Sequence, residues 1–134
     1  MLIADLQWGR GIMNQGMPWE NYLQTILPAG SRLAPNAKTF DYFDRETGLA
    51  ISAKTLDTMT DSRIANPSSI YYTLKGYVDK MDSYAGGVNG GAIEAKQMLV
   101  AIPSATTATG MAQINRAIEY AQSLGIVIKT TKVN

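Results

Sequence analysis

The stretch that decides the fold is residues 40–55, Phe-Asp-Tyr-Phe-Asp-Arg-Glu-Thr-Gly-Leu-Ala-Ile-Ser-Ala-Lys-Thr. Aromatic and aliphatic residues fill both ends of this stretch, and a polar segment at residues 45–48 separates them. That segment ends in Gly48, which adopts positive φ without a steric penalty. The pattern therefore predicts two short antiparallel strands joined by a tight turn.

The turn also sets which side chains face one another across the hairpin. If it is symmetric about residues 46–47, paired positions have numbers that sum to 93, and Asp41 lies opposite Ser52. Because side chains alternate between the faces of a strand, Lys54 shares a face with Ser52. Directly opposed residues have Cβ atoms about 4.5–5.5 Å apart. The sequence therefore predicts a cluster of one carboxylate, one hydroxyl and one ammonium group. A one-residue bulge at Gly48 would shift the register and bring Asp44 into contention.

Such a cluster suits metal-assisted cleavage of a phosphodiester when a second acid lies nearby. The acids hold a divalent ion through oxygen, and the lysine orients water or stabilises the developing charge. Asp41 and Lys54 could instead form a cross-strand ion pair on a solvated hairpin, since structural ion pairs of this kind are common.

An acid at the end of one strand, followed by Ser-Ala-Lys on the next, resembles the degenerate PD-(D/E)xK nuclease signature. Within that superfamily the chain is most similar to the C-terminal toxin domains of CdiA proteins, the effectors of contact-dependent growth inhibition. The matching residues are Glu20 in Pro-Trp-Glu-Asn-Tyr-Leu, Asp41 in the first strand, and Ser52 and Lys54 in Ile-Ser-Ala-Lys-Thr. Their order and approximate spacing are similar to the family's.

The resemblance implies roles for these four residues. Glu20 and Asp41 would bind a divalent metal (zinc, or magnesium or manganese), Ser52 would support a ligand or water, and Lys54 would stabilise charge. The wider superfamily usually has an acid two residues before the lysine, where this chain has Ser52. A hydroxyl is a weaker ligand than a carboxylate, so Glu20 has to supply the missing negative charge. The alternative role for Glu20 is a first-turn acid that interacts with the helix dipole.

The resemblance also implies a parent protein, a substrate and a neutralising partner. Residues 1–134 would be a single nuclease toxin domain, the C-terminal fragment of a much larger secreted cell-surface protein, delivered to the cytoplasm of a target cell. The implied substrate is DNA, with tRNA as the alternative, and a cognate immunity protein neutralises the domain. In such toxins a protruding hairpin can be bound by the immunity protein through strand addition. The candidate residues here are Tyr84, Val88, Asn89, Ile93 and Lys96. A non-enzymatic α/β binding module is the further alternative.

The amino-acid composition excludes several kinds of catalytic and metal-binding site. The chain has no cysteine and no histidine, which excludes disulfides, zinc–thiolate sites, serine–histidine triads and histidine-based ribonuclease chemistry. Any acid–base or metal chemistry must come from carboxylates, lysine, tyrosine or hydroxyls. The net charge of +1 is low for a nucleic-acid-binding protein, so the local distribution of charge matters more than the sum. Four cations are candidates for phosphate contacts beside the cluster, or else solvated surface charges: Arg32, Lys38, Arg45 and Arg63.

Apolar periodicity predicts the other elements. We expect an imperfect helix over residues 1–16, a second helix that begins at Pro18 and ends near residue 27, and a third after Pro67. A buried strand over residues 98–102, an amphipathic helix over 111–124 and a last strand from residue 126 follow. Together with the hairpin, these elements predict a mixed central β-sheet flanked by helices, which is the restriction-endonuclease-like core of the PD-(D/E)xK superfamily.

Overall fold

The computed structural model describes residues 6–134. Its elements in chain order are α1 (Ile12–Ile26), β1 (Tyr42–Asp44), β2 (Leu49–Thr55), α2 (Asp61–Ala65), α3 (Ser68–Asp82), β3 (Ala95–Pro103), α4 (Ala108–Ser123) and β4 (Ile126–Val133).

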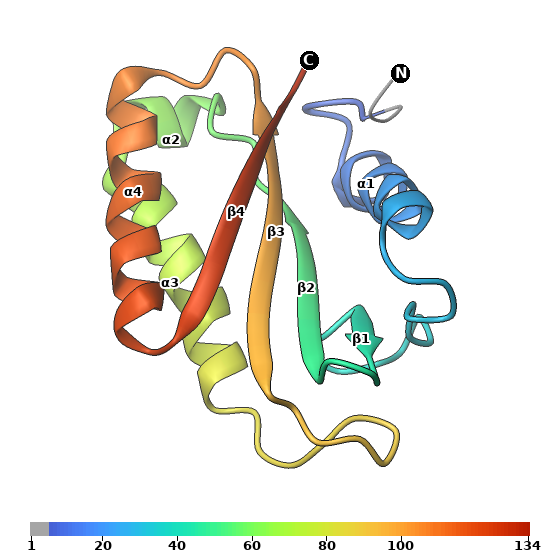
Figure 1. Cartoon of the computed structure of the whole chain (residues 1–134). Helices are drawn as coiled ribbons and strands as arrows, with labels where there is room; N and C mark the ends of the chain where they lie inside the picture. Colours follow the sequence, from blue (N-terminus) through green and yellow to red (C-terminus); the bar gives the residue numbers. More distant parts are fainter. Residues whose placement is uncertain (1–5) are drawn as a thin grey trace.

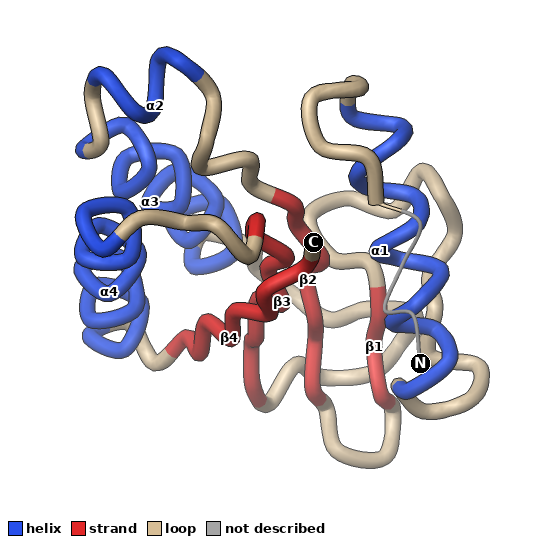
Figure 2. The backbone as a smooth tube through the Cα atoms, turned by 90° about the horizontal axis from the view of Figure 1, so that it is seen from above, coloured by secondary structure: helices blue, strands red, loops and turns tan. Residues whose placement is uncertain are grey.

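The four strands form one mixed sheet in the order β1-β2-β3-β4. β1 is antiparallel to β2, whereas β2, β3 and β4 run parallel to one another. Figure 1 shows α1 on one side of this sheet and α3 and α4 on the other, and Figure 2 shows the same layers from above. The predicted mixed sheet with flanking helices is confirmed.

The predicted hairpin register is also confirmed. Tyr42 pairs with Ile51 and Asp44 pairs with Leu49, so the paired numbers sum to 93. Gly48 has φ +74°, as the turn requires. The alternative register with a bulge is wrong, because the carboxylate of Asp44 is used inside the turn. It accepts hydrogen bonds from the backbone N–H of Glu46 and the hydroxyl of Thr47, both 3.0 Å long.

The sheet separates two apolar layers, and both arise from the alternation of strand side chains. Between the sheet and α3 and α4, the buried residues include Phe43, Ala50, Met98, Val100, Ile102, Ile70, Leu74 and Ile114. Between the sheet and α1, they include Trp19, Leu23, Tyr42, Ile51, Ala101 and Val133. β3 contributes to both layers, as predicted for a strand buried on both faces.

The first helix differs from the expectation. α1 runs through Pro18 without a break, whereas the sequence predicted a new helix at that proline. Proline cannot donate to the carbonyl four residues earlier, that of Asn14. Here that carbonyl accepts from the backbone N–H of Gln7 at 3.0 Å, so the group is satisfied. The expected helix over residues 1–16 lies partly outside the described residues. Within them, residues 6–11 are not helical and residues 12–16 form the start of α1.

The later elements follow the predictions closely. α3 begins directly after Pro67. α4 is followed at residue 125 by a glycine with φ +74°. β4 then begins at Ile126. Parallel pairing of β3 with β4 is confirmed. No helix in residues 6–134 is long and apolar enough to span a membrane.

The segment expected to form an immunity-binding hairpin is a loop between α3 and β3 that extends beyond the end of the sheet (Figure 1). A single bridge joins Val88 and Gly91, and the next strand begins only at Ala95. Two of the candidate side chains already have contacts within the domain. Val88 is buried in the core, and the Lys96 ammonium donates to the carbonyl of Met81 at 2.7 Å. Tyr84 and Ile93 also pack against the core, which leaves Asn89, with φ +47°, exposed at the tip. The expected turn is confirmed, but the protruding two-stranded ribbon is not present in the described residues.

Candidate active site at the open edge of β2

The candidate site forms where β2 extends beyond β1. β1 pairs with β2 only as far as Ile51, and the chain before β1 turns away from the sheet. Thr39 adopts φ +70°, and the backbone N–H of Phe40 donates to the carbonyl of Lys38 at 2.7 Å. Ala53 therefore has no strand partner on this side, and its N–H donates instead to Oδ2 of Asp41 at 2.7 Å. An open sheet edge of this kind exposes backbone polar groups to other partners.

Three predicted site residues converge on one cavity beside this edge. Glu20 comes from α1, Asp41 from the residue before β1, and Lys54 from the far end of β2. The cavity has a volume of about 500 Å³, and all three side chains line it. Its remaining lining residues are Gly11, Gln15, Ala37, Thr39, Ala53, Thr55, Leu56, Asp57, Arg63, Tyr77 and Lys80. The elements thus bring together residues that are 34 positions apart in the chain.

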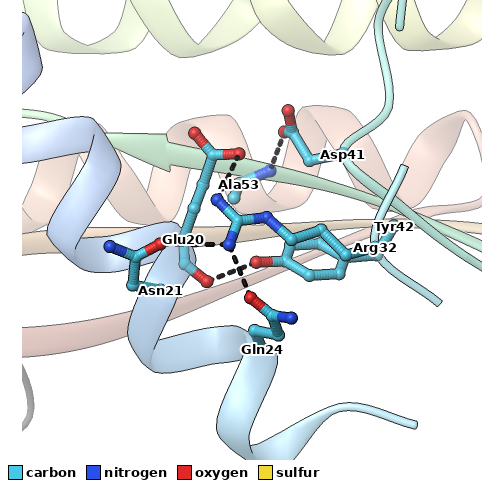
Figure 3. A network of polar contacts seen from close by, with 7 residues as sticks. All are labelled: Glu20, Asn21, Gln24, Arg32, Asp41, Tyr42 and Ala53. Carbon is cyan, nitrogen blue, oxygen red and sulfur yellow. Dashed lines mark hydrogen bonds and ion pairs between the residues drawn. The ribbon is translucent and has the colours of Figure 1, made fainter. Parts of the chain in front are cut away.

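Glu20 is held in place by its neighbours in α1 and β1. Trp19 is 1% exposed, and its indole N–H donates to the carbonyl of Leu99 in β3 at 3.1 Å. The hydroxyl of Tyr42 donates to the backbone carbonyl of Glu20, and burial raises the pKa of Tyr42 to about 12. Because α1 begins at Ile12, Glu20 lies in the middle of the helix, and its alternative role as a first-turn acid is wrong. Figure 3 shows its side chain extending from α1 towards Ala53 and Asp41.

Burial disfavours the ionised form of both carboxylates. Burial and then the charge of Asp41 raise the pKa of Glu20, while Arg32 and Lys54 lower it to a smaller extent. Burial also raises the pKa of Asp41, against the smaller opposing effects of the Ala53 hydrogen bond, Lys54 and Arg32. Desolvation thus exceeds the support that the two cations provide. Two partly buried acids with raised pKa values form a site that a cation would stabilise.

Ser52 is placed differently from the other predicted residues. It shares a strand face with Lys54, as the alternation requires, but it is only 1% exposed and does not line the cavity. Its hydroxyl has no hydrogen-bond partner among the described residues. A buried hydroxyl without a partner is unusual, since most such groups are hydrogen-bonded.

Arg32 lies on the other side of the carboxylate pair. A second cavity of about 430 Å³ is lined by Arg32 and shares Glu20 and Asp41 with the first. Nη1 of Arg32 donates to the side-chain oxygens of Asn21 at 3.0 Å and Gln24 at 2.6 Å. Nη2 lies 4.0 Å from Oε1 of Glu20, as Figure 3 shows. Two neutral acceptors therefore fix the guanidinium at the edge of a long ion pair with Glu20.

The other three basic candidates are not equivalent. Arg63 lines the first cavity, and its guanidinium donates to the backbone carbonyl of Asp57 at 2.9 Å. Lys38 is exposed and lines a separate hollow with Tyr84. Arg45 does not lie beside the cluster as expected, because it belongs to the hairpin turn. The turn is at the opposite end of β2 from Lys54, five residues or about 17 Å along the strand.

Sequence reasoning missed the contribution of α3 to the site. Tyr77 and Lys80 line the cavity, and Nζ of Lys54 lies 4.5 Å from the ring centroid of Tyr77. The spacing of these two residues by three places them on one helix face. Periodicity identified that helix, but no signal in the sequence showed that this face would pack beside Lys54. Gln15 was also missed, although it accepts a hydrogen bond of 3.4 Å from the hydroxyl of Thr55.

Glu20 and Asp41 are the residues that could hold a divalent metal. They fit such an ion because they supply carboxylate oxygens from two parts of the chain to one cavity, and burial raises the pKa of both. Among residues 6–134 there is no group of three or more acidic ligands placed to hold an ion. Water or substrate oxygens would therefore complete the coordination, as in catalytic metal sites that keep open positions.

Comparisons with known proteins show what the chain is similar to. The family described as "CDI toxin restriction endonuclease-like domain" matches residues 15–131. The chain is 43% identical to "Deoxyribonuclease CdiA" of Yersinia pseudotuberculosis serotype O:3 (strain YPIII), over 97% of this chain and 13% of that protein. It is 44% identical to "Deoxyribonuclease CdiA-o11" of Escherichia coli O157:H7 (strain EC869), over 97% of this chain and 36% of that protein. The chain thus spans only a minor part of both relatives.

A solved structure, "CdiA-CT/CdiI toxin and immunity complex from Yersinia pseudotuberculosis", matches the fold with a TM-score of 0.77 and 41% identity. The match covers 88% of this chain and 100% of that one. Together with the family match over most of the sequence, it confirms the resemblance drawn from the four spaced residues. The chain belongs to the family of restriction endonuclease-like toxin domains of contact-dependent growth inhibition.

Proposed function

We propose that this chain is a metal-dependent deoxyribonuclease toxin that hydrolyses phosphodiester bonds in the DNA of a neighbouring bacterial cell. The observation that carries the proposal is the convergence of Glu20, Asp41 and Lys54 on one cavity at the open edge of β2. The names of both curated relatives, which are deoxyribonucleases, favour DNA over tRNA as the substrate.

Each site residue has its own role in the proposed hydrolysis. Glu20 and Asp41 would hold the ion, which when bound supplies Lewis-acid polarisation of a phosphate oxygen and a more acidic water. Lys54 donates to the non-bridging phosphate oxygens and stabilises the negative charge that develops on them. The resemblance assigns Ser52 to support a ligand or water, but its hydroxyl is buried and outside the cavity lining, so we assign it no direct contact with the ion or the phosphate. Arg32 and Arg63 would bind phosphates on the two sides of the carboxylate pair.

We propose that residues 1–134 form one toxin domain at the C-terminal end of a much larger secreted protein. The small share of the curated relatives that the chain covers supports its being part of a larger protein. Such a domain would be delivered into the cytoplasm of a target cell. A cognate immunity protein would neutralise it, as the toxin and immunity complex of the structural relative suggests. The loop around Asn89 is the candidate contact, since Asn89 is exposed whereas Val88 is buried and the Lys96 ammonium donates to the carbonyl of Met81.

The test is cleavage by the purified domain. Supercoiled plasmid and total tRNA are incubated with the domain in EDTA and then with Mg²⁺, Mn²⁺ or Zn²⁺ added back. We expect the plasmid to be nicked and linearised only with a divalent ion, and the ion that restores activity identifies the cofactor. Asp41→Asn and Lys54→Gln should each reduce cleavage by about 100-fold or more without lowering the thermal transition. Arg45→Gln is the matched control, because Arg45 lies at the far end of the hairpin.

Three outcomes would contradict the proposal. Cleavage that persists in EDTA would exclude the metal. Cleavage of tRNA with the plasmid left intact would change the substrate. Unchanged activity in both the Asp41 and Lys54 variants would show that the cluster is a structural ion pair.

A further inference from the structure

We propose that Tyr77 is a positioning residue for the reaction: its ring holds the ammonium group of Lys54 at the cavity wall and leaves the N–H donors of that group free for the phosphate. The inference rests on the proposed nuclease function and extends it to a residue of α3 that neither the sequence motif nor the family description includes.

The contact between these residues is direct. Nζ of Lys54 lies 4.5 Å from the centroid of the Tyr77 ring, within the range of a cation–π interaction. Both residues are half-buried and both line the 500 Å³ cavity. Among the contacts of residues 6–134, no ion pair within 4.0 Å and no hydrogen bond engages this ammonium group. The ring of Tyr77 is therefore in direct contact with the ammonium group, whereas Glu20 and Asp41 act on its charge without an ion pair within 4.0 Å.

A ring and a carboxylate would hold the ammonium group with different consequences. A carboxylate would accept one or two of its three N–H groups and cancel its charge. The face of an aromatic ring attracts the cation through its quadrupole and leaves N–H groups that point away from the ring without a partner. In this arrangement Asp41 and Glu20 stay available for the metal, and Lys54 stays available for the phosphate.

Tyr77 is itself firmly placed. Its neighbours in α3, Leu74 and Val78, are fully buried, and Tyr77 packs against the same core. Lys54, by contrast, carries its charge at the end of a flexible four-carbon stem. The reaction requires that charge in one position. Contact with a fixed ring restricts that stem before the substrate arrives, which reduces the ordering needed in the transition state.

The first test observes the contact without any activity. In a sample labelled on lysine, the ε-methylene protons of Lys54 should be shifted upfield by the ring current of Tyr77. The resonance is assigned with Lys54→Gln. We expect Tyr77→Phe to keep the upfield shift and Tyr77→Leu, which preserves an apolar side chain, to remove it. An unshifted Lys54 resonance in the wild-type domain would overturn the inference.

The second test separates positioning from packing. We expect Tyr77→Leu to lower kcat on DNA about tenfold with KM nearly unchanged, and Tyr77→Phe to stay within about twofold. Adding Tyr77→Leu to Lys54→Gln should cause no further loss of the residual rate. Tyr120→Leu is the matched control, since Tyr120 packs against the same core but does not line the cavity. A wild-type kcat in Tyr77→Leu, a loss confined to KM, or an equal loss in Tyr120→Leu would each contradict positioning.

The two tests also separate the inference from the proposed function. If the wild-type domain cleaves no DNA, the proposed function fails, and the Lys54 resonance alone decides whether the ring holds the ammonium group. If the domain cleaves DNA but the resonance is unshifted, the function stands and the positioning role is wrong.

Discussion

Asp41 accepts a hydrogen bond from the backbone N–H of Ala53, 2.7 Å long, at the place where β2 has run past the end of β1. The carboxylate thus occupies the position that the backbone of a longer partner strand would take. The same bond fixes Asp41 beside the cavity that Glu20 and Lys54 line. A short first strand is therefore what creates the site, because one more strand pair would cover it.

This bond predicts a difference between two variants of Asp41. Asp41→Asn keeps an oxygen for the Ala53 N–H and removes a charge that burial disfavours, so the thermal transition should stay level or rise. Asp41→Ala removes the acceptor and should cost about 1 kcal/mol of unfolding free energy. Both should reduce DNA cleavage by about 100-fold or more. Differential scanning calorimetry and a plasmid assay measure the two effects. An Asn variant as unstable as the Ala variant would show that the charge itself supports the fold.

The raised pKa values of Glu20 and Asp41 predict how stability depends on pH. Above their ordinary values of 4.5 and 3.8, the folded domain binds protons that the unfolded chain does not. These two groups therefore contribute stability at low pH that is lost as pH rises through their folded-state pKa values. Asp79 has the opposite effect on the pH dependence of stability, because hydrogen bonds from Tyr120 and Lys75 lower its pKa.

The measurement isolates the pair by difference. Urea unfolding of the wild type and of Glu20→Gln/Asp41→Asn is followed from pH 7 down to pH 4. We expect the free energy of unfolding of the wild type to increase relative to that of the double variant as pH falls. A constant difference between the two proteins would mean that neither acid has a raised pKa in the folded state.

The hairpin could be predicted from the sequence because its determinants are local. Gly48 supplies positive φ, the polar turn defines the centre, and alternation then gives the face of every side chain. These local rules are sufficient to put Asp41 and Lys54 on one side of the hairpin. The same locality explains why α3, α4 and the two long parallel strands could be located in the sequence.

The parts that could not be predicted depend on contacts distant in sequence. Pro18 indicates a helix start by its own chemistry, and only the backbone N–H of Gln7, which satisfies the carbonyl of Asn14, permits the helix to continue through it. Tyr77 belongs to the site because α3 packs beside β2, a relationship with no short-range signal. Arg45 is close to Asp41 in the sequence, yet the hairpin directs it to the other end of β2.

Gly48 and Gly76 predict opposite effects of the same substitution. Gly48 has φ +74°, and a Cβ there would lie 2.5 Å from Cγ of Glu94 and 3.0 Å from the carbonyl oxygen of Ala92. Gly48→Ala should therefore cost at least about 1–2 kcal/mol and disturb the register that places Asp41. Gly76 lies in α3, where an added Cβ would meet nothing within 4 Å, so Gly76→Ala should stabilise the domain by about 1 kcal/mol. Equilibrium denaturation measures both, and a tolerated Gly48→Ala would contradict the strained turn.

Arg32 and Arg45 carry the same charge at the two ends of the hairpin and predict different responses to salt. Arg32 lines the cavity that adjoins the carboxylate pair, and its guanidinium is fixed by the neutral side chains of Asn21 and Gln24. A phosphate bound there would release about one counterion, so Arg32→Gln should weaken DNA binding and reduce the slope of log K against log salt by about 1. Arg45→Gln should leave that slope unchanged, because the turn lies about 17 Å along β2 from Lys54. Binding is measured by fluorescence anisotropy in EDTA, so that no cleavage occurs. Equal slopes in the two variants would show that the DNA backbone does not pass the Arg32 side of the site.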